Sequence, residues 1–282
     1  MKSRDSLYFL ALLIYAMLPF TLMFGFSQEI HSAQVVKKTI FYDGVERTYW
    51  EHVPETYNGL CPVPLVIMLH GGGGNGVAAH TMSGWSTLAD QENFIVVYPD
   101  GGLWNDYNWS GQPDDVGFLK ALIDKLKVEY IIDEKRIYTT GHSMGAGMTL
   151  TFAFKYTDVL AAIAPVSGPW ITDDRMFNLN PLSVPQPTAP IPVYLWRGEK
   201  ETWPSLSEER LRIQYWTSWN HCNVSAQVYD EGIYRTEVYG DGRAEVRYTE
   251  IKDRGHGTYD FKTAAKIWYD FFSQLTRETV HS

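Results

Sequence analysis

Short apolar-rich runs that alternate with helical patterns constrain this chain more than any other feature of its sequence. Each run has the length of a strand and is too short for a helix, and the most apolar ones show no polar alternation. Such runs are typical of strands buried on both faces of a parallel sheet. They are residues 64–69, 94–98, 136–140, 160–165, 191–196 and 245–251. The sequence therefore predicts the α/β class, with a mostly parallel central sheet and helices on both faces.

Helical periodicity fills the gaps between these runs. Asp114 and Asp115 precede the first helical pattern, where acidic side chains favour a helix N-terminus. A hairpin is predicted at residues 35–42 and 47–53. Nothing resembles an inter-domain linker, so we predict one domain over residues 34–282, with the proline-rich stretch 170–190 as a lid-like insert. The predicted helices are residues 116–130, 144–156, 206–219 and 261–275.

The first 33 residues have the pattern of an export segment. Lys2 and Arg4 precede an apolar run over residues 7–26, and polar residues follow it. The run is also long enough to cross a bilayer. We therefore expect residues 1–33 to be either a signal peptide or an uncleaved membrane anchor. Either alternative makes the remainder secreted or extracytoplasmic and confines any membrane contact to this segment.

Charge and cysteine content exclude several classes of function. The net charge of −9 disfavours binding to nucleic acid, whose phosphates an acidic surface repels. Cys61 and Cys222 are too few for a disulfide scaffold or a Cys-rich zinc site, although outside the cytoplasm they could form one bridge. We predict no metal and no organic cofactor. Aromatic residues make up 15% of the chain, which suits either a sugar-binding surface or an aromatic-rich core.

Residues 141–145 read Gly-His-Ser-Met-Gly, directly after one predicted strand and directly before a predicted helix. In this G-x-S-x-G context the serine lies on a strained turn, and the two glycines make room for it. The helix N-terminus beside it favours developing negative charge. We predict that Ser143 is a nucleophile.

A serine nucleophile needs a base, and we predict that His256 provides it. In folds built around such a serine turn, the order along the chain is serine, acid, histidine, which excludes the histidines before Ser143. His142 is adjacent to Ser143 and should point away from it. His256 stands in Arg-Gly-His-Gly after the last predicted strand, where glycines let a loop place a side chain at the strand ends.

The acid that orients this histidine should follow the predicted strand at 191–196. The sequence there contains two glutamates, Glu199 and Glu201, and no aspartate. We favour Glu201 and keep Glu199 as the alternative. A more distant acid such as Asp230 also stays open.

An oxyanion hole needs backbone N–H groups that point at the tetrahedral intermediate. One should belong to Met144, the residue after the nucleophile. The other should come from the glycine-rich loop after residues 64–69, where we favour Gly72 and keep Gly73 as the alternative. A phosphate-binding role for this loop is disfavoured because no Gly-Lys-Ser/Thr follows.

Several segments together resemble the polyhydroxybutyrate depolymerase and feruloyl esterase family of α/β-hydrolases. They are PLVIMLHGGGGN, DDVGFLKALIDKL, RIYTTGHSMGAGMTL, AAIAPVSG and the late RGHG, and the likeness spans about residues 35–275. The resemblance implies an α/β-hydrolase fold and an extracellular serine esterase with Ser143 as nucleophile and His256 as base. The family pattern after the seventh strand is usually His-Gly-x-x-Asp. Here Arg197 replaces the histidine, and Glu201 stands at the acid position.

The resemblance also implies where substrate binds. Trp109 matches a segment that lines the substrate cleft in this family, and we place His142 with it as a substrate-binding residue. Asp114 and Asp115 match a family acidic pair that we interpret as structural. The expected substrates are carboxylic esters, including feruloyl or other aromatic esters and hydroxyalkanoate or related polyesters, possibly polymeric or polysaccharide-linked.

Two other classes of function share parts of this pattern. A peptidase or an acyltransferase of the same fold would use the same three side chains. A catalytically impaired α/β-hydrolase could instead bind a carbohydrate or a protein, an alternative that the unusual acid keeps open. The natural ester, the oligomeric state and the fate of residues 1–33 are not determined by the sequence.

Overall fold

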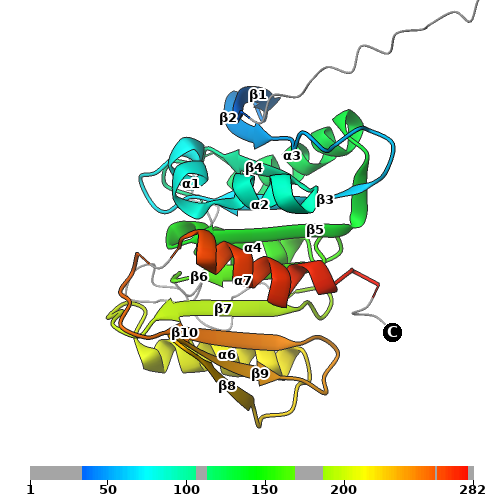
Figure 1. Ribbon diagram of the computed structural model, residues 1–282. Coiled ribbons are helices and arrows are strands. Elements are labelled where there is room, and N and C mark those ends of the chain that lie inside the picture. Colours follow the sequence, from blue (N-terminus) through cyan, green and yellow to red (C-terminus); the bar gives the residue numbers. More distant parts are fainter. Residues whose placement is uncertain (1–33, 106–112, 169–186, 258, 279–282) are drawn as a thin grey trace, which may run out of the picture. The chain divides into compact units, whose positions relative to one another are not determined.

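The computed structural model describes residues 34–105, 113–168, 187–257 and 259–278 (Figure 1). The predictions for residues 1–33, for Trp109 and for most of the insert at 170–190 lie outside these residues. Within them, no helix is long and apolar enough to span a bilayer. Cys61 and Cys222 are both free, so the bridge that the sequence permitted is not formed.

Ten strands form one sheet in the order β1-β2-β4-β3-β5-β6-β7-β10-β9-β8. The central strands from β4 to β10 pair in parallel, and antiparallel strands flank them on both sides. This arrangement confirms the predicted mostly parallel sheet. The strands are β1 Val36–Tyr42, β2 Val45–His52, β3 Val63–Leu69, β4 Ile95–Pro99, β5 Ile132–His142, β6 Ala162–Val166, β7 Val193–Gly198, β8 Gln227–Glu231, β9 Tyr234–Tyr239 and β10 Val246–Ile251.

Helices cover both faces of the sheet. They are α1 Gly76–Ser83, α2 Trp85–Glu92, α3 Asp115–Glu129, α4 Met144–Lys155, α6 Leu206–Trp219 and α7 Phe261–Asp270, with a 3-10 turn η2 at Phe272–Gln274. Helices α3, α4 and α6 pack on one face, and α1, α2 and α7 pack on the other (Figure 1). A hydrophobic core lies on each face of the sheet, and strand β3 contributes to both. Leu65 and Ile67 point to the first face, while Val66 and Met68 point to the second. This two-sided burial is why the run carries no polar residue.

The sequence analysis missed four short elements. Helices α1 and α2 have eight residues each and meet at Gly84, whose φ of +71° suits glycine. Strands β8 and β9 form a hairpin at the edge of the sheet, and every residue of β8 is exposed. An exposed edge strand has no apolar face, so hydrophobic patterning could not reveal it.

Asp115 is a buried structural acid at the start of α3. Its Oδ1 forms an ion pair with Arg47 of β2, and its Oδ2 accepts a hydrogen bond from the Asn105 amide at 2.6 Å. Its neighbour Asp114 caps α3 by accepting from the Gly117 amide at 2.9 Å. The guanidinium of Arg47 lies 4.1 Å from the centroid of the Phe118 ring. Both acids therefore hold the fold together, in agreement with the structural interpretation of the pair.

We predict that Asp115→Asn lowers the free energy of unfolding by about 3–5 kcal/mol, because it leaves the Arg47 charge buried without its partner. Denaturant unfolding followed by circular dichroism measures the change. Asp124→Asn is the control, since Asp124 pairs with Lys120 on the exposed face of the same helix. Exposed pairs contribute about 0–1 kcal/mol. Equal losses in the two variants would contradict this account of Asp115.

Candidate active site

Four loops that carry the predicted site residues leave the same edge of the sheet. The glycine loop follows β3, Ser143 follows β5, Glu201 follows β7 and His256 follows β10. These four strands are parallel, so their carboxyl ends lie together (Figure 1). Ligands of open α/β sheets bind at this edge.

Ser143 occupies the sharp turn between β5 and α4. Its φ of 55° and ψ of −120° are unusual for a residue with a side chain. Its amide donates to the Val166 carbonyl of β6 at 3.0 Å, which fixes the turn against the sheet. A Cβ at Gly145 would lie 2.3 Å from the Leu69 carbonyl oxygen, so the helix can start here only with glycine at that position. The surrounding backbone thus holds Ser143 in a strained conformation.

The structure brings Ser143, His256 and Glu201 together. His256 Nε2 lies 2.9 Å from Ser143 Oγ, and His256 Nδ1 lies 3.6 Å from Glu201 Oε2. The nearby carboxylate favours a proton on Nδ1, which leaves Nε2 to accept the serine hydroxyl hydrogen. The 3.6 Å distance from Nδ1 to Glu201 Oε2 is longer than a hydrogen bond. The geometry is that of a nucleophile, a base and an orienting acid.

Glu201 is a fully buried carboxylate with donors around it. Its Oε1 accepts from Ser167 Oγ at 2.5 Å and from the Gly198 amide at 2.7 Å. Burial raises the pKa of Glu201, but the nearby His256 and the hydrogen bonds from Ser167 and Gly198 outweigh it, and the net pKa is lowered. The side chain therefore stays ionised at neutral pH. Ser167, which follows β6 in the segment AAIAPVSG, was not singled out as a site residue by the sequence analysis.

Arg197 is a buried side chain that braces the turn carrying Glu201. The arginine is 2% exposed, and its Nη2 donates to the Glu201 main-chain oxygen at 2.6 Å. Its Nη1 pairs with Glu250 Oε2 of β10 at 3.3 Å. Arg197 therefore ties the turn that carries Glu201 to the strand that leads to His256. The sequence marked Arg197 as a departure from the family pattern, but only the fold reveals this contact.

The two alternative acids are engaged elsewhere. Glu199 Oε2 accepts from the Asp253 amide at 2.9 Å. Asp230 lies on the exposed edge strand β8 and pairs with Arg235. The geometry thus favours Glu201 over Glu199 and Asp230.

The glycine loop is held by His70. Its Nδ1–H donates to the Gly71 carbonyl at 2.7 Å, and its Nε2 accepts from the Gly101 amide at 3.0 Å. Its ring stacks on Trp104 with centroids 4.7 Å apart. Burial lowers the pKa of His70, which keeps the imidazole neutral, as its two hydrogen bonds require.

The amides of Gly72 and Gly73 differ in whether they are already engaged. The Gly73 amide donates to the Gly102 carbonyl at 3.2 Å, whereas the Gly72 and Met144 amides donate to no acceptor among the described residues. A Cβ at Gly72 would lie 2.4 Å from Met144 Sδ, so the two residues are in contact. This arrangement favours Gly72 over Gly73 as the partner of Met144.

His142 and Tyr259 hold the loop that carries His256. We predicted His142 as a substrate-binding residue, but its Nε2–H donates to the main-chain oxygen of His256 at 2.6 Å. Burial lowers the pKa of His142. The buried Tyr259 hydroxyl accepts from Trp85 Nε1 at 2.8 Å and lies 2.7 Å from Thr140 Oγ1. His142 is therefore placed to position His256. Tyr259 was missed because its partners are distant in sequence.

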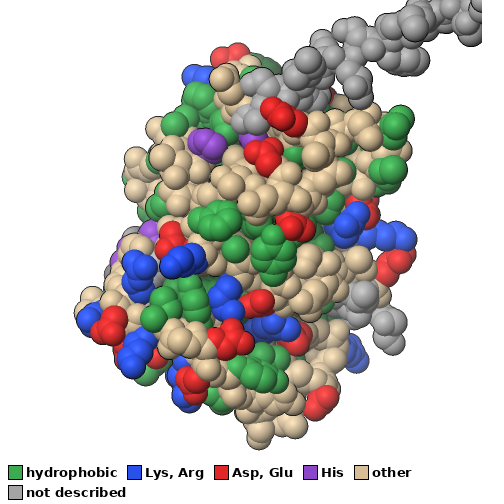
Figure 2. Space-filling model, in the orientation of Figure 1, with side chains coloured by type: hydrophobic (Ala, Val, Ile, Leu, Met, Phe, Trp, Pro, Cys, Tyr) green, Lys and Arg blue, Asp and Glu red, His purple; other side chains and the backbone are tan. Residues whose placement is uncertain are grey.

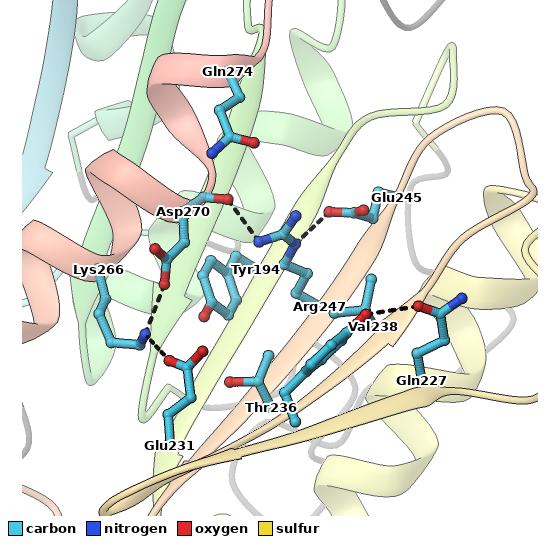
Figure 3. Close-up of a pocket in the computed structure, with 11 residues that line it drawn as sticks. Tyr194, Gln227, Glu231, Thr236, Val238, Glu245, Arg247, Lys266, Asp270 and Gln274 are labelled. Carbon is cyan, nitrogen blue, oxygen red and sulfur yellow. Dashed lines mark hydrogen bonds and ion pairs between the residues drawn. The ribbon is translucent and has the colours of Figure 1, made fainter.

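A pocket of about 380 Å³, called the second pocket, lies away from the candidate triad, among β7–β10 and α7 (Figure 3). Its charged side chains are paired within the pocket: Lys266 bridges Glu231 and Asp270, and Arg247 contacts Glu245. None of the predicted site residues lines it. On the face that Figure 2 shows, acidic and basic side chains are interspersed around it. Among the described residues, no group of three or more His, Cys, Asp or Glu could hold a metal ion.

Comparisons with known proteins show a likeness to esterases. Residues 49–174 match the family model described as esterase PHB depolymerase. A bifunctional acetylxylan esterase/xylanase of Neocallimastix patriciarum is 28% identical over 76% of this chain, and a poly(3-hydroxyalkanoate) depolymerase C of Paucimonas lemoignei is 29% identical over 74%. The matched regions span only 31% and 58% of those two proteins.

A solved structure shares the fold. The acetyl xylan esterase from Aspergillus awamori superposes with a TM-score of 0.64 and covers 84% of this chain and 99% of its own, at 17% sequence identity. At this identity the likeness shows the fold alone. The predicted α/β-hydrolase fold is confirmed.

We predict that Gly145→Ala destabilises the protein by at least about 1–3 kcal/mol, because the new methyl group collides with the main chain of β3. Gly240→Ala is the matched control, since a Cβ there meets no atom within 4 Å. Thermal unfolding of both variants measures the difference. A Gly145→Ala variant as stable as the Gly240→Ala control would show that the turn is not packed as described.

The lowered pKa of His70 predicts a loss of stability in mild acid. The folded state binds fewer protons than the unfolded chain, so the contribution of neutral His70 is complete above about pH 6.5 and declines as the pH falls toward the folded pKa. We expect His70→Asn to lose less stability than the wild type between about pH 7.5 and about pH 5.5. His142 and His80, whose pKa values are also lowered, leave a residual slope in the variant. Parallel slopes in denaturant titrations would contradict the assignment.

Proposed function

Because residues 49–174 belong to the esterase PHB depolymerase family and the chain has the α/β-hydrolase fold, we propose that this protein is a serine carboxylic-ester hydrolase. Ser143 is its nucleophile, His256 its base and Glu201 its acid. The observation that carries the proposal is the 2.9 Å contact between His256 Nε2 and Ser143 Oγ, in line with the buried Glu201 carboxylate.

The reaction proceeds through an acyl-enzyme. His256 Nε2 takes the Ser143 proton as Oγ attacks the ester carbonyl carbon, and the Gly72 and Met144 amides stabilise the resulting oxyanion. When the tetrahedral intermediate collapses, His256 returns this proton to the leaving alcohol. Water, activated by the same histidine, then releases the acid and restores Ser143. Glu201 stabilises the imidazolium in both steps.

The substrate belongs to the carboxylic esters. The names of the relatives point to acetylated xylan and to polyhydroxyalkanoates, and the sequence resemblance adds feruloyl and other aromatic esters. These substrates are polymeric or polysaccharide-linked, which agrees with export through residues 1–33, as a signal peptide or as an anchor. The insert at 170–190 is proposed to cover the cleft, and Trp109 to line it.

A catalytically impaired binding module is the weaker alternative. The atypical acid motivated it, but the Glu201 carboxylate is buried 3.6 Å from His256 Nδ1, its pKa is lowered, and Arg197 holds its main chain. A module that only binds has no need of this arrangement. Peptidase and acyltransferase activities would use the same three side chains, and the family match favours the esterase.

We predict that Ser143→Ala lowers kcat on p-nitrophenyl acetate by about 10⁴-fold or more, because the nucleophile is lost. Glu201→Gln should lower it by about 10²–10⁴-fold, because the imidazolium loses its counter-charge. Initial rates with purified, folded variants test both expectations.

Glu199→Gln is the control for the acid, and its rate should stay within about twofold of the wild type, the limit expected for a group outside the proposed triad. A larger loss in Glu199→Gln than in Glu201→Gln would move the role of the acid to Glu199. A Ser143→Ala variant with undiminished turnover would refute the serine mechanism.

A further inference from the structure

A pocket of about 300 Å³ opens beside His256. It is lined by Lys200, Glu201, Thr202, Trp203 and His256. Neither Ser143 nor the glycine loop lines it, so it lies on the histidine side of the nucleophile. Its volume is at the lower end of the range for small-molecule sites, which suits one ring more than a long polymer segment. The sequence analysis did not single out Trp203.

The reaction geometry decides which half of an ester such a pocket can receive. The carbonyl oxygen must point to the Gly72 and Met144 amides, on the glycine-loop side. The alkoxy oxygen must lie within hydrogen-bond distance of His256 Nε2, because this atom delivers the proton to it. The alcohol portion therefore extends past His256, on the side where this pocket lies. The acyl portion extends away from it.

The lining combines one aromatic side chain with polar groups. Trp203 is half-buried, while Thr202 is exposed and Lys200 pairs with Asp253 at the rim at 2.9 Å. An indole presents a flat apolar face that is electron-rich, and the C–H face of a pyranose ring is complementary to it. The Thr202 hydroxyl and the Lys200 ammonium can hydrogen-bond the sugar hydroxyls around such a ring.

We propose that this pocket is the subsite for the leaving alcohol and that Trp203 selects a sugar ring there. The inference rests on the proposed esterase function and deepens it, because it predicts O-acylated carbohydrates as the preferred esters and assigns the preference to one side chain. Ester selectivity then depends on the alcohol through Trp203 and on the acyl group through other contacts.

The test compares acetates that differ only in their alcohol: methyl acetate, phenyl acetate and an O-acetylated methyl xylopyranoside. The measured quantity is the ratio of kcat/KM for the sugar ester to that for methyl acetate. We expect Trp203→Ala to lower this ratio about tenfold, the size typical of losing one central aromatic contact. Trp203→Phe should retain most of the ratio, because it keeps a ring. A general structural defect would lower both rates and leave the ratio unchanged.

A second series varies the acyl group with methanol as the common alcohol: acetate, ferulate and 3-hydroxybutyrate. Trp203→Ala should change these ratios much less than it changes the sugar ratio. Tyr229→Ala is the matched control, since it removes a half-exposed ring from the second pocket (Figure 3), which lies elsewhere in the fold. It should leave the sugar ratio at the wild-type value.

The outcomes separate the two proposals. A folded wild type that hydrolyses none of the esters would refute the proposed function. Hydrolysis with a sugar ratio that Trp203→Ala does not change would overturn only the subsite. A drop for phenyl acetate without one for the sugar ester would overturn the choice of a sugar ring.

A binding measurement covers the case in which the Trp203 variants turn over too slowly to assay. Calorimetric titration of Ser143→Ala with the acetylated xyloside should give a Kd about tenfold lower than that of Ser143→Ala combined with Trp203→Ala. Circular dichroism identifies the variants that are folded. Equal affinities in a folded pair would overturn the proposal.

Discussion

The close packing of main chain around Ser143 is the constraint on which the rest of the site depends. The residue adopts a positive φ between two glycines, with the end of β3 pressed against Gly145 and the end of β6 bonded to the Ser143 amide. Such a turn stores strain and persists only because the surrounding strands hold it. The register of the parallel sheet therefore sets the backbone conformation at Ser143 and with it the direction of the serine hydroxyl.

Three buried carboxylates also shape the structure, and each has a charged or polar partner. Asp115 faces Arg47, Glu209 faces Arg212, and the Glu201 carboxylate accepts hydrogen bonds from Ser167 and Gly198. Burial by itself raises the pKa of a carboxyl group, because it disfavours the charged form. At Glu201 the surrounding donors reverse this effect, whereas at Glu209 burial dominates and the pKa is raised. The pKa values of these two buried glutamates thus shift in opposite directions.

Sequence reasoning could single out a candidate residue where the signal lies in its neighbours along the chain. Adjacent residues in the sequence are enough to identify the glycines around Ser143, the histidine in its glycine loop and the glutamates after β7. It failed where the role depends on distant partners. The bond from His142 to the His256 main chain, the support of Tyr259 by Trp85 and Thr140, and the exposed hairpin β8–β9 leave no local pattern.

The sequence by itself determined the α/β class, most strands and helices, and the chemical types of the candidate triad, because apolar periodicity and glycine placement are local properties. Only the tertiary structure favoured Glu201 over Glu199 and Gly72 over Gly73, and placed Trp203 beside His256. These choices depend on which atoms meet across strands far apart in the chain. That proximity is set by the order and register of the sheet, which no local pattern encodes.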